Sequence, residues 1–133
     1  MDTAENRRRY ARLPKSFRVE VSEFAFPLSG QPLHTVKSAD ISAGGIKVDS
    51  PRHFAPGDKV QVRVYIPSLN KYHPGFMKVF ESDAGQHLVA IAEVAWAEEA
   101  VPGTSYVLGL KFLDVDQDDW TALSNLIRKQ LGV

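Results

Sequence analysis

The sequence predicts a mainly β fold, a small antiparallel barrel or sandwich with one helix at the C-terminus. Two observations support this prediction. Short segments in which apolar and polar residues alternate recur along the chain, and turn residues separate them. Only the last segment changes to the three- and four-residue spacing of an amphipathic helix. Many short strands with turns between them are typical of compact antiparallel β domains.

Length and composition indicate one globular domain. The 133 residues are 44% hydrophobic and 10% aromatic, enough to build a core without disulfides. No apolar run approaches the roughly 18 residues of a membrane span, and the polar first residues lack the apolar stretch of a secretory signal. Cysteine is absent, which excludes a disulfide framework and a thiol nucleophile. We therefore expect a cytoplasmic protein.

The charge is zero in total but unevenly distributed along the chain. Residues 1–18 hold six Lys or Arg against two Asp or Glu, whereas the other 115 hold ten against fourteen. We expect residues 1–14 to form a flexible basic arm and residues 15–133 to form the single domain. A basic arm on a mildly acidic body favours a local anion site. A nucleic-acid surface would need a strongly basic domain.

Alternating residues predict the strands, and clusters of Gly, Pro, Ser, Asn and Asp predict the turns. The clearest strand is Val60–Ile66, where every second residue is Val or Ile. The other predicted strands are Phe17–Phe24, Leu33–Ile41, one starting at Ile46–Val48, Leu88–Ala97 and Tyr106–Phe112. Turns are predicted at Leu28–Pro32, Ser42–Gly45 and Ala55–Asp58. The longer loop Pro67–Gly75 leaves room for a short extra hairpin over Phe76–Gln86.

The C-terminal segment predicts an amphipathic helix. The acidic run Asp116–Asp119 favours a helix start, since its side chains cap free N–H groups and oppose the positive end of the dipole. Gly132 suits the helix end, and two basic residues precede it. The predicted apolar stripe consists of Trp120, Leu123, Ile127 and Leu131.

Signatures of common enzyme classes are absent from the sequence. It contains no HExxH, GxSxG, Walker-type glycine loop or GxGxxG, and its four histidines show no ligand spacing. The acidic residues from Asp114 to Asp119 lack the glycine and glutamate of a calcium loop, so helix capping explains them better. We predict a binding protein with no catalytic residue, metal or cofactor.

The arm contains an Arg-x-x-x-Arg pair, Arg8 and Arg12. A separation of four places both side chains on one side of a helix or of an extended arm. Guanidinium groups bind phosphate through a planar fork and also pair with or stack on guanine. Taken alone, the run has a simpler interpretation as a solvated basic tail.

A second motif follows one of the predicted strands, Asp40-x-Ser42-x-x-Gly45. Asp40 and Ser42 are two residues apart at a strand end, so they face the same way. Asp40 offers an acceptor to the N1–H and N2–H₂ edge of guanine, and Ser42 can hydrogen-bond a phosphate or a base. Gly44 and Gly45 allow close approach of the backbone. Taken alone, this segment is an ordinary hairpin turn.

Together the two motifs, about thirty residues apart and in this order, resemble the PilZ domain family. The resemblance continues through Gly57, Val94-Ala95-Trp96 and Tyr106–Phe112 into the final helix, from about Arg7 to Leu131. It implies a six-stranded antiparallel barrel with a C-terminal helix, and cyclic di-GMP as the ligand. The long Pro67–Gly85 excursion departs from the family pattern.

The resemblance also implies roles for individual residues. Arg8 and Arg12 would hold the phosphates and guanine faces, and Asp40, Ser42, Gly44 and Gly45 would form the opposite side of the site. Trp96 has two equally supported placements, beside the ligand as a stacking surface or inside the barrel core. Lys111 on the neighbouring strand is a further candidate.

The implied mechanism is a switch in bacterial signalling, with motility or biofilm regulation as the output. Cyclic di-GMP would fold the arm against the barrel and change the surface offered to a protein partner in trans. Members of the family bind either one ligand or a stacked pair. Arg7 adds another guanidinium group that can contact a second ligand, so we expect two per chain. Arg9 is the other candidate for this role.

Three alternatives remain open at the level of sequence. The first is a PilZ-like interaction module that works without nucleotide. The second is a small barrel that binds RNA through the arm, against which the negative charge of the body counts. The third, a nucleotide-hydrolysing enzyme, lacks any base, nucleophile or metal constellation.

Overall fold

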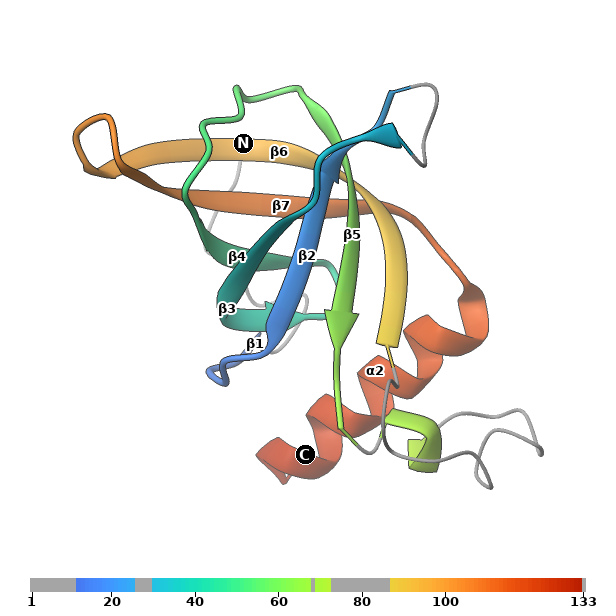
Figure 1. Ribbon diagram of the computed structural model, residues 1–133. Helices are drawn as coiled ribbons and strands as arrows, with labels where there is room; N and C mark the ends of the chain where they lie inside the picture. Colours follow the sequence, from blue (N-terminus) through green and yellow to red (C-terminus); the bar gives the residue numbers. More distant parts are fainter. Residues whose placement is uncertain (1–11, 26–29, 68, 73–86, 133) are drawn as a thin grey trace.

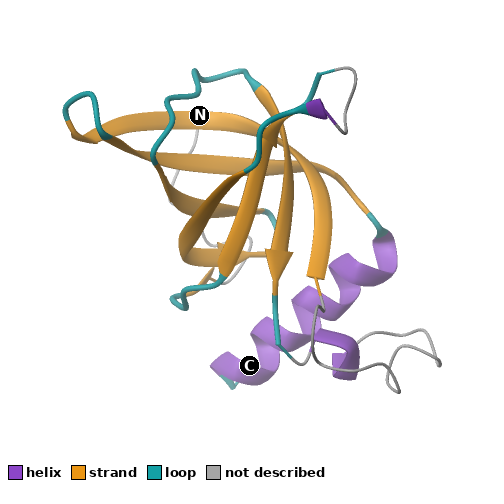
Figure 2. Ribbon diagram, viewed as in Figure 1, coloured by secondary structure: helices purple, strands orange, loops and turns teal. Residues whose placement is uncertain are grey.

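The apolar residues of the alternating segments line the inside of a closed β-barrel, and one helix lies across the end of the barrel (Figures 1 and 2). The computed structural model describes residues 12–25, 30–67, 69–72 and 87–132. The strands are β1 (Arg12–Leu13), β2 (Arg18–Glu23), β3 (His34–Ser42), β4 (Gly45–Ser50), β5 (Lys59–Tyr65), β6 (His87–Val101) and β7 (Ser105–Val115).

Six of these strands close into a ring in the order β2, β5, β6, β7, β4, β3. Every neighbouring pair is antiparallel, and β3 completes the ring by pairing with both β2 and β4. β1 pairs with β3 and lies outside the ring order. Within the described part of the chain, the predicted six-stranded antiparallel barrel is therefore confirmed, with one short strand added.

The barrel core consists of the inward residues of each strand. Val60, Val62 and Val64 of β5 are fully buried, and Ile66 just after the strand is also buried. The residues between them point outward, as a period of two requires. Burial of these β-branched side chains is the main force that holds the strands in register, because a slip of one residue would expose the whole apolar face.

The β6–β7 hairpin is longer than predicted and projects beyond the barrel (Figure 1). β5 pairs with β6 only from His87 to Glu93, so the rest of β6 has β7 as its one neighbouring strand. β4 pairs with β7 from Lys111 to Tyr106, almost as far as the hairpin turn. The predicted strand ended at Ala97 because alternation stops there. The structure continues it to Val101, since pairing with β7 alone suffices to keep the ribbon extended.

Two further predictions differ from the structure. Residues 12 and 13 were assigned to the free arm, but they form β1, because Leu13 is buried opposite Ile41 of β3. The predicted loop after β5 contains the short 3₁₀ helix η2 (Leu69–Tyr72), whose Leu69 is buried. The predicted hairpin at residues 76–86 lies outside the described residues.

Helix α2 (Gln117–Leu131) has the predicted ends. The Asp116 carboxylate accepts from the backbone N–H groups of Asp118 and Asp119, and Gly132 closes the helix in the left-handed conformation. The buried face is Ala122, Leu123, Leu126 and Ile127. The predicted stripe is thus wrong at its two ends, where Trp120 is half-buried and Leu131 is exposed. No described helix is long and apolar enough to cross a membrane.

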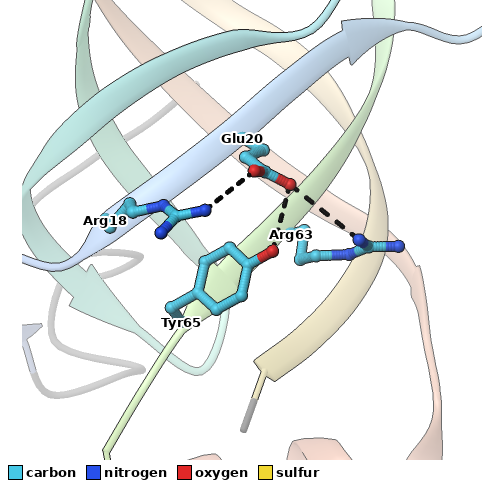
Figure 3. A network of polar contacts seen from close by, with 4 residues as sticks. All are labelled: Arg18, Glu20, Arg63 and Tyr65. Carbon is cyan, nitrogen blue, oxygen red and sulfur yellow. Dashed lines mark hydrogen bonds and ion pairs between the residues drawn. The ribbon is translucent and has the colours of Figure 1, made fainter. Parts of the chain in front are cut away.

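A polar network covers the outside of β2 and β5 (Figure 3). Glu20 accepts a hydrogen bond from Arg18 at 3.0 Å and one from the Tyr65 hydroxyl at 3.2 Å. The Arg63 guanidinium lies 3.9 Å from the same carboxylate, and the Arg18 guanidinium lies 4.3 Å from the centre of the Tyr65 ring. The hydrogen bond from Arg18, followed by the one from Tyr65 and the charges of both arginines, lowers the pKa of Glu20 against partial burial.

This network makes the free energy of unfolding depend on pH. Because the pKa of Glu20 is lowered in the folded state, its contribution is fully present above the unfolded pKa of about 4.5 and is lost as pH falls through the folded value. Glu20→Gln should therefore lose less unfolding free energy than the wild type between pH 7 and pH 3, by up to about 1 kcal/mol. Urea unfolding at both pH values measures this difference. Glu98→Gln, on the exposed hairpin, is the matched control, and equal acid losses in all three proteins would contradict the assignment.

Candidate functional site

The β3–β4 hairpin holds the Asp-x-Ser-x-x-Gly motif. Ser42 pairs with Gly45, which leaves Ala43 and Gly44 as a two-residue turn. The Ser42 hydroxyl donates to the Gly45 carbonyl at 3.3 Å and accepts from the Gly44 N–H at 3.2 Å. Both bonds lie within the turn. The serine therefore stabilises the turn and keeps one oxygen lone pair for any other partner.

Contacts from distant segments fix this turn. The indole N–H of Trp120, in the first turn of α2, donates to the Ala43 carbonyl at 2.8 Å. The backbone N–H of Phe112 in β7 donates to the Gly44 carbonyl at 3.0 Å. The turn therefore has one geometry set by the helix and the barrel, and a ligand would meet a preformed surface.

Gly45 lies where the backbone of β4 passes very close to that of β7. A Cβ atom at this position would overlap the carbonyl oxygen of Leu110 and come within 3.3 Å of the Lys111 Cα. The glycine is therefore required by the packing of two backbones. The sequence predicted close backbone approach at Gly45, but by a ligand; the structure shows approach by another strand.

Arg12 and Asp40 come together although they are far apart in the sequence. β1 pairs with β3 so that Arg12 lies opposite Ser42, and the guanidinium reaches the Asp40 carboxylate at 3.7 Å. The Arg12 side chain is 53% exposed and that of Asp40 is 23% exposed. Such an open pair contributes little to stability, so both groups can exchange partners at low cost. Arg7, Arg8 and Arg9 lie outside the described residues.

Ser38 fixes the short β1 strand beside Asp40. Its buried hydroxyl accepts from the Phe17 N–H at 2.8 Å and donates to the Lys15 carbonyl at 3.2 Å, which holds the connection between β1 and β2. The β3–β4 register shifts between Ser38 and Asp40. The shift explains how Ser38 faces inward while Asp40, two residues later, faces outward.

The outward positions beside this hairpin form two rows across the barrel surface. One row contains Arg12, Ser42, Gly45 and Lys111, and the other contains Asp40, Lys47, Gly109 and Trp96. Three strand spacings separate the ends of each row, roughly 14 Å along the sheet. Among the described residues, neither Lys47 nor Lys111 makes an ion pair. Glu93 of β6 pairs with Lys111 and extends the first row, so the surface has three cations against two carboxylates. This small positive excess suits an anion.

Sequence analysis missed Lys47. The signal was present, because the flanking Ile46 and Val48 are apolar and turn inward, which makes the residue between them face outward beside Asp40. Lys111, which was considered, lies directly opposite Gly45 and is exposed.

Trp96 takes the outward of its two expected placements. The side chain is 40% exposed, and its indole covers Gly109, where a Cβ atom would overlap the ring. Its exposure excludes packing in the barrel core. In a regular strand Trp96 would face the same way as Val94, two residues earlier, which is buried. The reason is a β-bulge between Val94 and Trp96, which reverses the facing of the residues that follow.

Within the described ranges, no three His, Asp or Glu side chains gather to hold a metal ion. The surface offers guanidinium and ammonium donors, carboxylate acceptors and an exposed aromatic ring. These are the groups that recognise phosphate and a nucleobase.

Comparisons with known proteins agree with this architecture. The model of the PilZ domain family matches residues 6–129 of the chain. The PilZ domain of YcgR from Escherichia coli, solved with c-di-GMP, is 17% identical with a TM-score of 0.60, over 95% of this chain and 98% of that one. The PilZ domain of CeSA from a cellulose-synthesizing bacterium is 20% identical with a TM-score of 0.50, over 92% and 96%.

A larger protein also shares the fold. The Bacillus subtilis inhibitor of motility MotI/DgrA is 21% identical with a TM-score of 0.67 over 99% of this chain, and the chain spans 57% of that protein. At these identities the likeness to solved structures shows the fold alone. A search of curated protein sequences found no match.

The contact at Gly45 generates a stability prediction. Gly45→Ala should lower the unfolding free energy by about 2–3 kcal/mol, because the new Cβ forces β4 away from Leu110. Thermal or urea unfolding measures the loss.

Gly57→Ala is the matched control, since a Cβ there meets nothing within 4 Å but the backbone has a φ of 95°. Its loss should be about 1 kcal/mol, from the left-handed backbone alone. If the Gly45 variant lost no more than the Gly57 variant, the close approach would not be a packing constraint.

Proposed function

Because this chain belongs to the PilZ domain family, we propose that it binds cyclic di-GMP between its arginine arm and the Asp40–Gly45 hairpin. The family match includes both motifs, since residues 6–129 contain Arg8, Arg12, Asp40 and Gly45. The protein of this proposal is a binding module, acting in the cytoplasm, with no catalytic step.

The observation that supports the proposal most is the meeting of the two motifs. Arg12 ends the arm and Asp40 begins the hairpin motif, and their side chains lie 3.7 Å apart on adjacent strands. Nothing in the sequence spacing alone requires this contact. A surface that joins an arginine pair to an aspartate suits a ligand with both phosphates and guanine edges.

Each group has a chemical task in this proposal. Arg8 and Arg12 supply planar guanidinium groups for the phosphates and guanine faces. Four residues of chain can separate the two by at most about 14 Å. Asp40 accepts from the N1–H and N2–H₂ groups of guanine. Lys47 and Lys111 add positive charge without fixed geometry, and Trp96 offers the face of an indole to a base.

The ligand would compete with a contact already present. Arg12 must leave Asp40, at least in part, when it turns toward a phosphate. Because Arg12 is exposed and Asp40 is partly exposed, the exchange costs on the order of 1 kcal/mol. Ligand binding would then order the arm on the barrel and alter the surface offered to a protein partner in trans.

Substitutions in the two motifs test the proposal. Arg8→Ala and Asp40→Ala should each weaken cyclic di-GMP binding by on the order of 1.5–3 kcal/mol, tenfold or more, because each removes a hydrogen bond to a charged group. Isothermal titration calorimetry measures the affinity, with GTP and cyclic AMP as specificity controls.

Arg128→Ala, at the far end of α2, is the matched control and should bind as the wild type does. Wild-type protein that gave no heat with cyclic di-GMP would disprove the proposal and leave a nucleotide-independent interaction module. Unchanged affinity in the Asp40 variant would remove the hairpin from the site.

The number of ligands is a separate prediction. Arg7 precedes the arginine pair and supplies a further fork, and two stacked dianions carry roughly four negative charges that such a fork can neutralise in part. We expect about two cyclic di-GMP per chain, and about one in Arg7→Leu. Calorimetric stoichiometry decides; Arg9→Leu tests the competing position, and a ratio near one in the wild type would contradict the prediction.

A further inference from the structure

A second surface lies on the outside of β2, β5 and β6. A groove of about 310 Å³ opens there, with Glu20, Gln61 and Arg63 among its lining residues. Leu33, from the segment before β3, and Val89 of β6 complete two of its sides. The volume is at the small end of ligand pockets and suits one or two side chains rather than a nucleotide.

The groove exposes apolar side chains that the fold does not use. Leu33 is 64% exposed and Val89 is 36% exposed, and both are among the few large hydrophobic residues exposed in the described part of the chain. Exposed apolar groups that gather around a depression with a polar rim are typical of interaction sites.

The charged groups beside the groove favour an acidic partner. Arg18 and Arg63 share one carboxylate, Glu20, whose side chain is only 15% exposed, while the guanidinium side chains are 59% and 47% exposed. Each guanidinium has five N–H donors, so most remain directed at solvent. A basic partner would find the Glu20 carboxylate already occupied (Figure 3).

The Arg18 guanidinium is also held in place. Arg18 stacks on the Tyr65 ring at 4.3 Å and hydrogen-bonds Glu20, which fixes the plane of its fork before a partner arrives. Groups ordered in advance lose little conformational entropy on binding. The arrangement therefore resembles a prepared receptor for a carboxylate.

Backbone pairing cannot supply the recognition. β2 is hydrogen-bonded on both edges, to β3 and β5, and β5 is hydrogen-bonded to β2 and β6. An extended partner therefore cannot add a strand here and must be recognised through its side chains.

We propose that this groove docks a segment of a partner protein in which a leucine-like side chain is next to a glutamate or aspartate. The apolar side chain enters between Leu33 and Val89, and the carboxylate binds the free donors of Arg63 and Arg18. The groove lies on β2, β5 and β6, whereas the rows beside the β3–β4 hairpin centre on β4 and β7, across the barrel. This inference extends beyond nucleotide binding and does not depend on it.

A peptide titration tests the chemistry directly. The probe is acetyl-Leu-Glu-Leu-Glu-Leu-amide, added to the ¹⁵N-labelled full chain and followed by ¹H–¹⁵N NMR. Amide shifts should concentrate at Gln61, Arg63 and Val89, and those of Lys47 and Gly109 should stay in place. The same peptide with lysine for each glutamate should bind about tenfold more weakly, the effect of one lost hydrogen bond to a charged group.

Two variants with matched controls locate the site. Leu33→Ser and Arg63→Gln should each weaken the glutamate peptide about fivefold or more. Val101→Ser, at a similarly exposed apolar position on the β6–β7 hairpin, and Arg128→Gln on α2 should leave it unchanged. Arg63→Gln keeps Arg18 and Tyr65 on Glu20, so the barrel surface stays intact.

The peptide test can be separated from the test of cyclic di-GMP binding. Calorimetry with cyclic di-GMP on Leu33→Ser should match the wild type, whether that value shows binding or none. The docking proposal is overturned if the glutamate peptide gives no localised shifts, if both peptides bind equally, or if the shifts gather on the β4–β7 face.

Discussion

Closure of the barrel depends on the contact between β4 and β7. β4 pairs with β3 along one edge and with β7 along the other, so it joins the two halves of the ring. At Gly45 the two backbones are so close that no side chain fits. The Trp120 indole holds the adjoining turn from the helix. The hairpin motif is therefore part of the seam of the fold, and its shape is fixed before any ligand binds.

This rigidity restricts where a ligand could cause change. The barrel interior is filled by buried side chains from all six strands, and a close-packed core deforms only at high cost. β1, in contrast, is two residues long, pairs with β3 alone and begins with the exposed Arg12. Short strands with few buried contacts open at low free energy. A signal from this surface would therefore pass through rearrangement of the arm rather than through the barrel.

Alternation in the sequence was sufficient to predict the strands because most of them have one buried and one exposed face. It failed at Trp96, because the bulge after Val94 reverses which face of the sheet the following side chains occupy. No residue in Val94-Ala95-Trp96 is typical of a bulge. It also stopped short in β6, since Glu98 and Glu99 pair with β7 alone and both are exposed. Helix ends were predictable because capping is local.

The family resemblance predicted that Arg12 and Asp40 belong to one site, but no local pattern predicted their direct contact, since it depends on β1 pairing with β3. Gly45 shows the same limit of prediction from sequence. The residue type correctly indicated a close approach, but only the three-dimensional structure identifies the approaching group as the Leu110 carbonyl. Local patterns thus predict which way a residue faces, whereas its contacts across the barrel depend on strand order, which no local pattern contains.

The distribution of charge affects how salt would act on binding. Residues 1–18 carry six positive groups against two negative ones, and the rest of the chain has an equal and opposite excess. This N-terminal segment, which includes the arm, is therefore attracted to the rest of the chain without any ligand. The Arg12–Asp40 pair is a visible instance of this attraction. A phosphate ligand must replace it. Salt screens the attraction of the arm to the body as well as to the phosphates, so the two effects on affinity oppose each other. The fall of affinity with salt should therefore be shallower than the number of phosphate contacts suggests, and it should steepen in Asp40→Asn, where the competing carboxylate is gone.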